Sequence, residues 1–373
     1  MTCITTPQSS MMIPNTKKYG VNIYNVLSTI HTKMRVAVVI LNWNGKKFLE
    51  QFLPKVIETC TGIADVVIAD NASTDDSVTF ISSSFPTVKT ITLDRNWGFA
   101  EGYNKALQQL TTYEYYVLLN SDIEVTSNWI QPVIDFMDKN ADYAACQPKL
   151  LSYYERDKFE YAGAAGGFID HLGYPFCRGR IFQNIETDNG QYDDYTEIFW
   201  ATGACMFVRA IAFWKVGGLD GGFFAHMEEI DLCWRLKNDN YKIGYCPDSV
   251  VYHIGGGTLP KSSSRKTYLN MRNNIIMIYK NLPDGKVFPV LFTRWFMDFA
   301  ASIKFLVDSG FSDLWAVIRG HLYFIRHLRS LKAQRKAIKH THVTKIYKKS
   351  IVMKHYLGRI NIFSELSSKD FTH

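Results

Sequence analysis

The chain has 373 residues, of which 47% are hydrophobic and 21% charged, and this composition excludes a disordered protein and fits one large or two smaller globular domains. The net charge of +7 is uneven, because residues 319–354 contain many Lys, Arg and His and no Asp or Glu. No apolar run reaches the ~18 residues of a membrane span, and seven cysteines without a C-x-x-C pair are typical of reduced thiols in a cytosolic protein.

Residues 1–33 are polar and irregular, whereas a strong strand pattern opens after Met34. We expect the first 33 residues to be a disordered or non-native extension, with Met34 as an alternative start. The N-terminal stretch lacks the compact apolar segment that is typical of a signal peptide.

Short apolar runs then alternate with helical patterns. Strands are expected at residues 35–41, 65–69, 88–93 and 115–119, and helices at 46–60, up to 83, and 102–110. A short apolar run without alternation is typical of a strand buried on both faces. Strand–helix units with short loops favour a mostly parallel sheet. The sequence therefore predicts an α/β fold.

Asn or Asp residues follow each of these four strands. They and their neighbours are the candidates for a ligand-binding site: Asn42, Trp43, Asn44, Asp70, Asn71, Asp75, Asn96, Gly98, Asn104, Asn120 and Ser121. Ligands of open α/β sheets bind at the carboxyl ends of the strands, where such side chains are able to hold a ribose, a base edge and a metal ion. Ordinary capping and turn chemistry is the alternative, which we favour for Ser73, Asp76 and Ser77.

The fourth strand runs directly into Asn120-Ser121-Asp122. On an extended chain, Asn120 and Asp122 point to the same side. Two oxygen-bearing side chains there suit a hard divalent cation shared with a phosphate, and a simple Asx turn is the alternative. The G-x-G-x-x-G pattern is absent after the first strand, which argues against dinucleotide binding.

Four segments, in order, resemble the family 2 glycosyltransferases, and most closely the rhamnosyltransferase-like subgroup of bacterial surface-polysaccharide synthesis. They are residues 39–45, 69–75, 96–104 and 118–122, within a similarity that covers roughly residues 35–283. The resemblance implies a GT-A fold, with Asp70 contacting the nucleobase and Asp122 binding the metal. This chain has Asn120 where the D-x-D motif has its first Asp.

The second half opens with a strand pattern over residues 198–209, interrupted by small residues that let a ligand or backbone come close. A glycine-rich stretch, residues 217–224, then predicts a flexible loop before a helix that starts with Glu228, Glu229 and Asp231. Acids at a helix N-terminus are favoured by the helix dipole, which is the structural alternative. In the resembled family, the second acid of a Glu-Asp motif deprotonates the acceptor, and Glu229 occupies that place. Glu228 and Asp231 are the less favoured candidates.

A strand over residues 241–252 ends before His253, which the resemblance implies as a second metal ligand or a diphosphate contact, and the glycines at 255–257 are expected to frame phosphates or act as a hinge. A helix over 268–280 places Arg272 and Asn273 toward the site or on the surface. After residue 283 the chain is predicted to be helical, amphipathic and basic, which suits an anionic membrane surface. Packing on the catalytic domain or on a second subunit is the alternative.

Together these features predict three regions: an extension over 1–33, a GT-A domain over 34–283, and a basic helical region over 284–373. The expected reaction is inverting transfer of a sugar, rhamnose being one candidate, from a nucleotide diphosphate sugar to a lipid-linked or cell-wall glycan acceptor, with Mn²⁺ or Mg²⁺. The expected location is the cytoplasmic face of the cell membrane, with no nucleic-acid partner. A nucleotidyltransferase and a non-catalytic sugar-binding protein are the alternatives, and the sequence leaves the oligomeric state open.

Overall fold

The computed structural model describes residues 34–255 and 263–373. The predicted extension over residues 1–33 lies outside the described residues, and so do Gly256 and Gly257 of the glycine run that follows His253.

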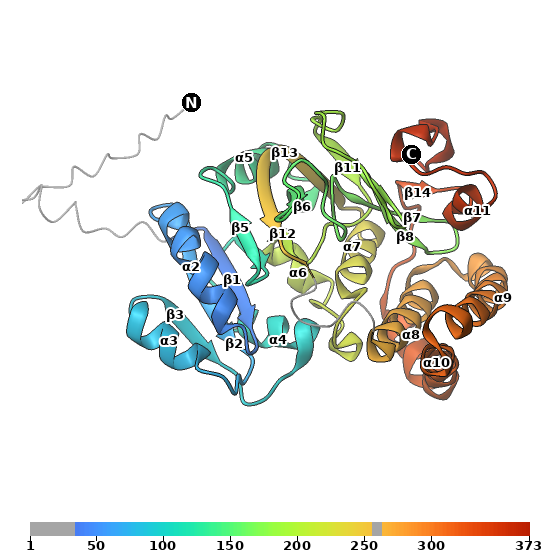
Figure 1. Cartoon of the computed structure of the whole chain (residues 1–373), viewed down its shortest axis with the longest axis horizontal. Coiled ribbons are helices and arrows are strands. Elements are labelled where there is room, and N and C mark those ends of the chain that lie inside the picture. Colours follow the sequence, from blue (N-terminus) through green and yellow to red (C-terminus); the bar gives the residue numbers. More distant parts are fainter. Residues whose placement is uncertain (1–33, 256–262) are drawn as a thin grey trace, which may run out of the picture. The chain divides into compact units, whose positions relative to one another are not determined.

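Strands and helices alternate from Val36 to Lys139 (Figure 1). The elements are β1 (Val36–Asn42), α2 (Lys46–Cys60), β2 (Asp65–Asp70), α3 (Ser77–Ser84), β3 (Lys89–Thr92), α4 (Gly98–Leu107), β4 (Tyr115–Leu119), β5 (Ile123–Val125) and α5 (Gln131–Lys139). The four expected strands all form. The helix predicted at 102–110 instead spans Gly98–Leu107.

The remaining chain adds further strands and then mainly helices. They are β6 (Tyr143–Ser152), β7 (Gly167–Asp170), β8 (Pro175–Cys177), β9 (Arg180–Ile181), β10 (Asn184–Ile185), β11 (Thr196–Ile198), β12 (Cys205–Arg209), α6 (Ala210–Lys215), α7 (Glu228–Asn238), β13 (Lys242–His253), α8 (Ser264–Asn281), α9 (Asp284–Ser309), α10 (Phe311–Ala337), β14 (Ile346–Tyr347) and α11 (Ile351–Tyr356). Short 3₁₀ turns cover Gly221–Phe223, Phe363–Glu365 and Ser368–Asp370.

Among the described residues, nine strands form the central sheet, in the order β11-β13-β6-β12-β4-β1-β2-β3, with β5 paired to β13. The longest ladders, β1 with β2 and β4, and β13 with β6, are parallel, while β12 runs antiparallel between β4 and β6. The α/β class and the mostly parallel sheet are thus confirmed. In this register Asn42 on β1 lies beside Asp70 on β2, so the two predicted strand-end groups are neighbours.

Both faces of the sheet are buried, as the unbroken apolar runs predicted. Along β1, Ala37 and Val39 belong to a core that includes Tyr103 of α4 and Leu232 of α7. The alternate residues of β1, together with Leu49 of α2 and other side chains, form a second core. Since successive strand residues point to opposite faces, each face of β1 is covered by its own helices.

A second sheet lies next to the C-terminal region. Its strand order is β10-β9-β8-β7-β14, and β14 pairs in parallel with β7 (Figure 1). Residues 34–373 form one compact unit. The region after residue 283 is mainly helical, as expected, and Ile346–Tyr347 adds a short strand to the sheet built from residues 167–185.

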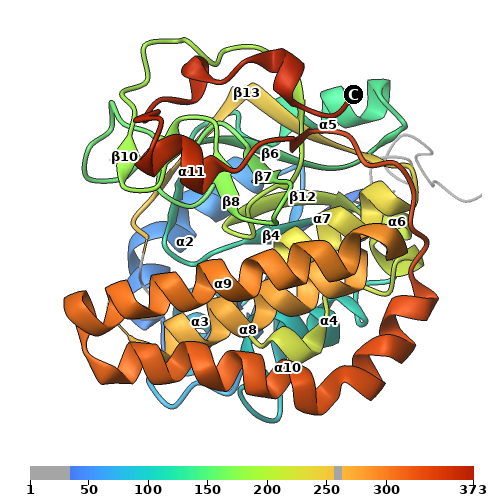
Figure 2. The same cartoon turned by 90° about the vertical axis from the view of Figure 1, so that its right-hand side faces the viewer.

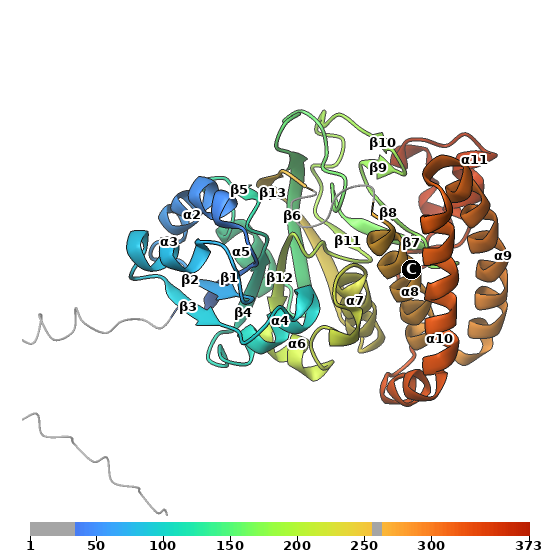
Figure 3. The same cartoon turned by 60° about the horizontal axis from the view of Figure 1, so that its bottom comes forward.

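Helices α8, α9 and α10 pack side by side (Figures 2 and 3). Gly320 of α10 lies close to the backbone of Arg272 on α8, where an added Cβ would be 3.1 Å from the amide nitrogen of Arg272. Within residues 34–255 and 263–373, none of the helices combines the length and the hydropathy that a membrane crossing requires.

Candidate active site

The ends of β1 and β2 meet in a buried polar cluster. Asn42 Nδ2 donates to Asp70 Oδ1 at 3.0 Å and to Ser73 Oγ at 3.1 Å, and both Asn42 and Asp70 are almost fully buried. Ser73 Oγ also donates to Asp70 Oδ1 at 2.6 Å. Asn42 Oδ1 has no hydrogen-bond partner. A buried, unpaired amide oxygen costs free energy unless a ligand or water satisfies it, which favours a ligand at this strand end.

Asn44 and Asp75 organise the two loops that leave this cluster. Asn44 is left-handed, with φ of 53°, and its Oδ1 accepts from the amide of Thr74 at 2.7 Å. Asp75 accepts from the amide of Lys46 at the start of α2 and from Ser77 at the start of α3. These bonds show that both side chains fix the backbone of the two loops. Trp43 between the strand and the loop is 44% exposed, and its place in donor binding stays a prediction.

Asn71 links the ends of β2 and β3. Its Nδ2 donates to the carbonyl of Gly98 at 2.9 Å and to Asn96 Oδ1 at 3.2 Å, and its Oδ1 accepts from the amide of Trp97. Gly98 has φ of +75°, which glycine adopts at little cost. A Cβ added there would lie 2.6 Å from the carbonyl oxygen of Phe224, so this position is required to be small.

Asn104 does not reach the strand-end cluster. Its side-chain amide exchanges two hydrogen bonds with the backbone of Leu219, at 2.8 Å and 3.0 Å. Asn104 thus anchors the chain that leads into the glycine loop, and this geometry favours a structural role over donor binding.

We had expected Asn120 and Asp122 to lie on an extended chain, but they do not. β4 ends at Leu119, and the amide of Ile123 donates to the carbonyl of Asn120 at 3.3 Å, so residues 120–123 form a turn. The amide of Asn120 is bonded to the carbonyl of Ala204 at 2.9 Å. This bond continues the pairing of β4 with β12 and fixes where the turn begins. Ser121 Oγ lies beside Gly45 at the end of β1.

Asp122 instead faces His253, at the end of β13. Asp122 Oδ1 and His253 Nε2 are 3.3 Å apart, and His253 Nδ1 is 3.2 Å from Glu160 Oε1. All three side chains are buried. Burial lowers the pKa of His253, but Glu160 and Asp122 outweigh it and raise that pKa to about 10. Burial likewise opposes ionisation of Asp122, and His253 reverses this, so the pKa of Asp122 is lowered.

Asp122 Oδ1 and His253 Nε2 are separated by nearly the ~3 Å expected of neighbouring ligands around an ion with bonds of about 2.1 Å. To bind a cation, His253 would have to release the proton that its raised pKa of about 10 retains at neutral pH. In the described part of the chain, no three His, Cys, Asp or Glu side chains gather as a complete metal site. Mg²⁺ needs no such cage, since it is usually held by one or two carboxylates, water and substrate phosphates.

The three acids at the start of α7 have different surroundings. Asp231 is fully buried and accepts from Arg235 Nε at 2.8 Å and Asn281 Nδ2 at 2.8 Å, with Lys280 Nζ at 3.2 Å. Burial opposes its ionisation, but Lys280 and Arg235 lower its pKa overall. A carboxylate held by three partners is a poor proton acceptor. This geometry therefore favours a structural role for Asp231.

Glu228 and Glu229 each carry a buried oxygen, Oε2, that has no hydrogen-bond partner. Burial raises the pKa of Glu229 to about 7. Burial and the neighbouring Glu229 raise the pKa of Glu228 well above its ordinary value. A carboxylate with a free oxygen and a pKa near neutral pH suits a general base, and Glu229 meets both conditions.

Glu229 also lies on the side of the strand ends. Its Cβ is 3.7 Å from the position of a Cβ added to Gly203, in the chain that leads to β12. The next residue, Ala204, accepts the hydrogen bond of Asn120. The structure therefore connects the acids of α7 to the end of β4 through small residues, as the Gly-Ala interruption of the strand pattern had indicated.

The glycine-rich loop before α7 is held in place, which differs from the flexible loop that its composition predicted. The carbonyl of Phe224 accepts from the amides of Phe99 and Ala100, at the start of α4. Asn273 and Arg272 of α8 bind further carbonyls of this loop. The tertiary contacts thus override the local freedom of the glycines.

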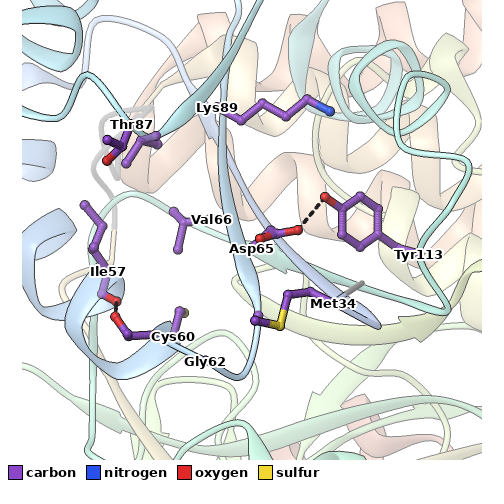
Figure 4. A pocket seen from close by; sticks show the side chains of 12 residues that line it. Met34, Ile57, Cys60, Gly62, Asp65, Val66, Thr87, Lys89 and Tyr113 are labelled. Carbon is purple, nitrogen blue, oxygen red and sulfur yellow. Dashed lines mark hydrogen bonds between the residues drawn. The ribbon is translucent and has the colours of Figure 1, made fainter. Parts of the chain in front are cut away.

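A pocket of about 410 Å³ lies elsewhere (Figure 4). Its lining includes Met34, Cys60, Asp65, Lys89 and Tyr113, which lie near the amino-terminal ends of the parallel strands. Asp65 accepts a hydrogen bond from Tyr113 Oη at 2.7 Å. None of the predicted site residues lines this pocket, so it is distinct from the strand-end site.

Two polar residues of the site, Ser73 and Glu160, were not predicted from the sequence. Ser73 bridges Asn42 and Asp70, although we had assigned it to turn chemistry; its place three residues after Asp70 was the available signal. Glu160 faces His253 from the chain between β6 and β7. Glu160 lies in no recognisable motif, so only the tertiary structure reveals it.

Comparisons with known proteins agree with this geometry. Residues 37–217 match the model of glycosyl transferase family 2. The N-acetylglucosaminyl-diphospho-decaprenol L-rhamnosyltransferase of Mycobacterium tuberculosis (strain CDC 1551 / Oshkosh) is 24% identical over 230 residues, which cover 58% of this chain and 75% of that protein. The rhamnosyltransferase WbbL of Escherichia coli (strain K12) is 41% identical over 158 residues, or 42% of this chain and 59% of WbbL.

Among solved structures, GalNAc-T7 with UDP, GalNAc and Mn²⁺ has a TM-score of 0.53 at 15% identity, covering 79% of this chain and 58% of that chain. The α/β fold is of the GT-A type. Residues 37–217 form a glycosyl transferase family 2 domain.

Proposed function

We propose that this enzyme transfers a sugar, with inversion, from a nucleotide diphosphate sugar to an acceptor hydroxyl, and that Glu229 is the general base. The observation that carries this proposal is the difference in surroundings between two acids at the start of α7. Asp231 is neutralised by Arg235 and Lys280, whereas Glu229 has an unpaired oxygen and a pKa of about 7. Inverting displacement requires such a base opposite the leaving diphosphate.

The donor is assigned to the carboxyl ends of β1, β2 and β4. Asp70 is fixed by Asn42 and Ser73, so its carboxylate is oriented for hydrogen bonds with a nucleobase. Asp122 and His253 would hold Mn²⁺ or Mg²⁺, which offsets charge on the leaving diphosphate when it is bound. Similarity in fold to a transferase solved with UDP and Mn²⁺ supports this assignment.

The acceptor is proposed to be a lipid-linked glycan precursor, with rhamnose as the first donor sugar to test. The support is the similarity to the mycobacterial rhamnosyltransferase, whose name specifies a diphospho-decaprenol acceptor, and to WbbL. A nucleotidyltransferase or a non-catalytic sugar-binding protein is the competing function.

A panel of sugar nucleotides separates these functions. Transfer, or slow donor hydrolysis, releases a nucleoside diphosphate, whereas a nucleotidyltransferase releases or consumes pyrophosphate. We expect nucleoside diphosphate release from one donor class, lost in Glu229→Gln. Release of pyrophosphate instead, or binding of donors without any turnover in the presence of acceptor lipid, would contradict the proposal.

We further propose that the α9–α10 hairpin binds an anionic membrane surface on the cytoplasmic side. Helix α9 exposes a continuous apolar stripe: Phe288 (78% exposed), Phe292 (53%), Trp295 (58%), Phe296 (59%), Phe299 (65%) and Ile303 (50%). Successive members of this stripe are three or four residues apart, except for the adjacent Trp295 and Phe296, so they lie on one face of the helix. An exposed aromatic face of this size marks an interaction site.

Two charged residues of α9, Arg294 and Asp298, lie on the inner side, where they are buried and paired with each other at 3.1 Å. Arg294 also lies over the ring of Tyr174 at 3.8 Å. These two residues therefore do not interrupt the exposed stripe. Along α10, basic side chains are exposed in a segment without acids: Arg319, Arg326, Arg329, Lys332 and Lys336. This combination favours anionic lipid over a protein partner.

Vesicle sedimentation tests the membrane proposal. Serine at Phe292, Phe296 and Phe299 should weaken binding by roughly 10²–10⁴-fold, because each ring, more than half exposed, contributes about 1–2 kcal/mol when buried in lipid. A control with serine at Tyr154, Ile211 and Leu357, which are exposed elsewhere, should bind as wild type. Deleting residues 284–373 would remove β14 from its sheet and is a poor test.

Equal binding by the two triple variants, or a wild-type protein that never sediments with anionic vesicles at low salt, would contradict membrane contact. A dimer in ultracentrifugation that only the α9 variant dissociates would instead identify the stripe as an interface between two copies.

A further inference from the structure

The loop that carries the candidate base has an unfavourable backbone. We call residues 220–227 the base loop, because they lead directly into Glu228 and Glu229. Three of its non-glycine residues are left-handed: Phe224, His226 and Met227, with φ of 65°, 70° and 71°. Each such residue costs about 1–3 kcal/mol and persists only where the surroundings enforce it. Contacts from outside the loop must therefore hold this conformation.

Two adjacent residues of α8 supply such contacts, in addition to the amides of Phe99 and Ala100 on α4, which donate to the carbonyl of Phe224. Asn273 Nδ2 donates to three carbonyls of the loop, those of Phe223 at 3.0 Å, Ala225 at 2.9 Å and His226 at 2.7 Å. Arg272 donates to the carbonyls of Gly222 at 3.0 Å and Phe223 at 2.9 Å. Both side chains are buried. Together they bind carbonyls along most of the strained segment, which otherwise lacks regular pairing.

A third contact orients the pair. Arg272 Nε donates to Asn273 Oδ1 at 2.8 Å, which aims the Asn273 amide nitrogen at the loop. The Arg272 guanidinium also lies 5.0 Å from the ring centroid of Tyr323 on α10. The α9–α10 hairpin thus contacts the Arg272 guanidinium through Tyr323.

We propose that Arg272 and Asn273 are positioning residues for the reaction, holding the base loop in the conformation that presents Glu229 to the acceptor. This inference rests on the proposed role of Glu229 as base. In this role the pair acts without contacting donor or acceptor. Its effect passes through the loop backbone, one residue of which, Met227, immediately precedes the helix that bears Glu229.

Asn273→Asp is the most specific test, because it keeps the size of the side chain and replaces the donor with oxygen that repels the three carbonyls. We expect kcat to fall by roughly 10–10²-fold, the cost of a displacement of about 1 Å. Affinity for a nucleoside diphosphate, measured by calorimetry, should stay within about twofold of wild type, since the base is remote from the nucleobase.

The pH profile supplies a readout that loss of stability alone would not change. The titratable groups that face Glu229 are Glu228 beside it and Cys233 on the next turn. A loosened loop admits water to Glu229, so the acidic limb of kcat/KM should move below that of wild type by about one pH unit. Ile278→Ala is the control. Ile278 is a buried residue of α8 that packs on Gly173, away from the loop, so this variant should melt earlier with an unchanged limb.

Arg272→Lys and Arg272→Met provide a second pair, should Asn273→Asp fail to fold. Lysine keeps one charged donor and should retain more activity than methionine, which keeps only the stem. Wild-type kcat and an unmoved limb in both Asn273→Asp and Arg272→Met would overturn the inference while leaving the base assignment intact. Full activity of Glu229→Gln, measured in parallel, would overturn both.

Discussion

Substitution of the acids at the start of α7 should separate catalysis from stability. Glu229→Gln keeps the size of the side chain but removes its ability to accept a proton. We expect turnover to fall by roughly 10²–10⁴-fold, the usual contribution of a general base. Asp231→Asn should lower turnover far less, because its carboxylate is occupied by Arg235, Lys280 and Asn281.

The effects of the two substitutions on stability should be reversed, because Asp231→Asn should destabilise the protein and Glu229→Gln should not. Asp231→Asn leaves Arg235 and Lys280 without their shared carboxylate in a buried site, and breaking such a pair costs about 3–5 kcal/mol. The lower end applies, since Lys280 keeps Asp220 at 2.5 Å. The folded pKa of Asp231 is depressed, so its contribution is present above the ordinary value of 3.8 and lost as the pH falls through the folded value. The deficit of Asp231→Asn should therefore shrink in acid.

Glu229→Gln should melt at or above the wild-type temperature at pH 8. In the wild type, the folded pKa of Glu229 is about 7, above the ordinary 4.5, so the native state loses stability as the pH rises between these values. Glutamine removes that cost, which is at most about 3 kcal/mol because a shift of one pKa unit corresponds to about 1.36 kcal/mol. Thermal melts and initial rates, measured for both variants and for Glu228→Gln, check this division. An active Glu229→Gln beside an inactive but well-folded Asp231→Asn would refute the reasoning.

Three further predictions concern the strand ends. Asp122→Ala should lose most activity and Mn²⁺ affinity while remaining folded, since Asp122 lies in a turn after β4 and not in the apolar core; full activity in excess chelator would exclude the metal. Asp70→Ala should weaken nucleoside diphosphate binding in calorimetry more than it slows turnover, whereas unchanged affinity would remove Asp70 from the donor site. Gly98→Ala should lower both melting temperature and turnover, because its Cβ would meet Phe224 of the base loop at 2.5–2.6 Å; wild-type values for both would show that the base loop adjusts freely.

The sequence by itself determined the layered fold and the positions of the strand-end groups. Apolar runs such as Tyr115–Leu119 specify buried strands through purely local preferences, and the turn-forming residues that follow mark their ends. Parallel strands then bring Asn42 and Asp70 together without further information, because their carboxyl ends share one edge. The helix start at Glu228 is equally local, since three acids favour a helix N-terminus.

Only the tertiary structure decided which acid is free to react. Glu229 and Asp231 are two residues apart on one helix, and the local sequence offers only Arg235, four residues after Asp231, to distinguish them. Lys280 and Asn281, about fifty residues further along the chain, bind Asp231 and leave Glu229 unpaired. The same holds for α9, whose Arg294 and Asp298 are held inward by Leu172 and Tyr174 and leave its aromatic side exposed. Long-range partners set the charge and burial of these groups, and partners so distant in sequence leave no local signal.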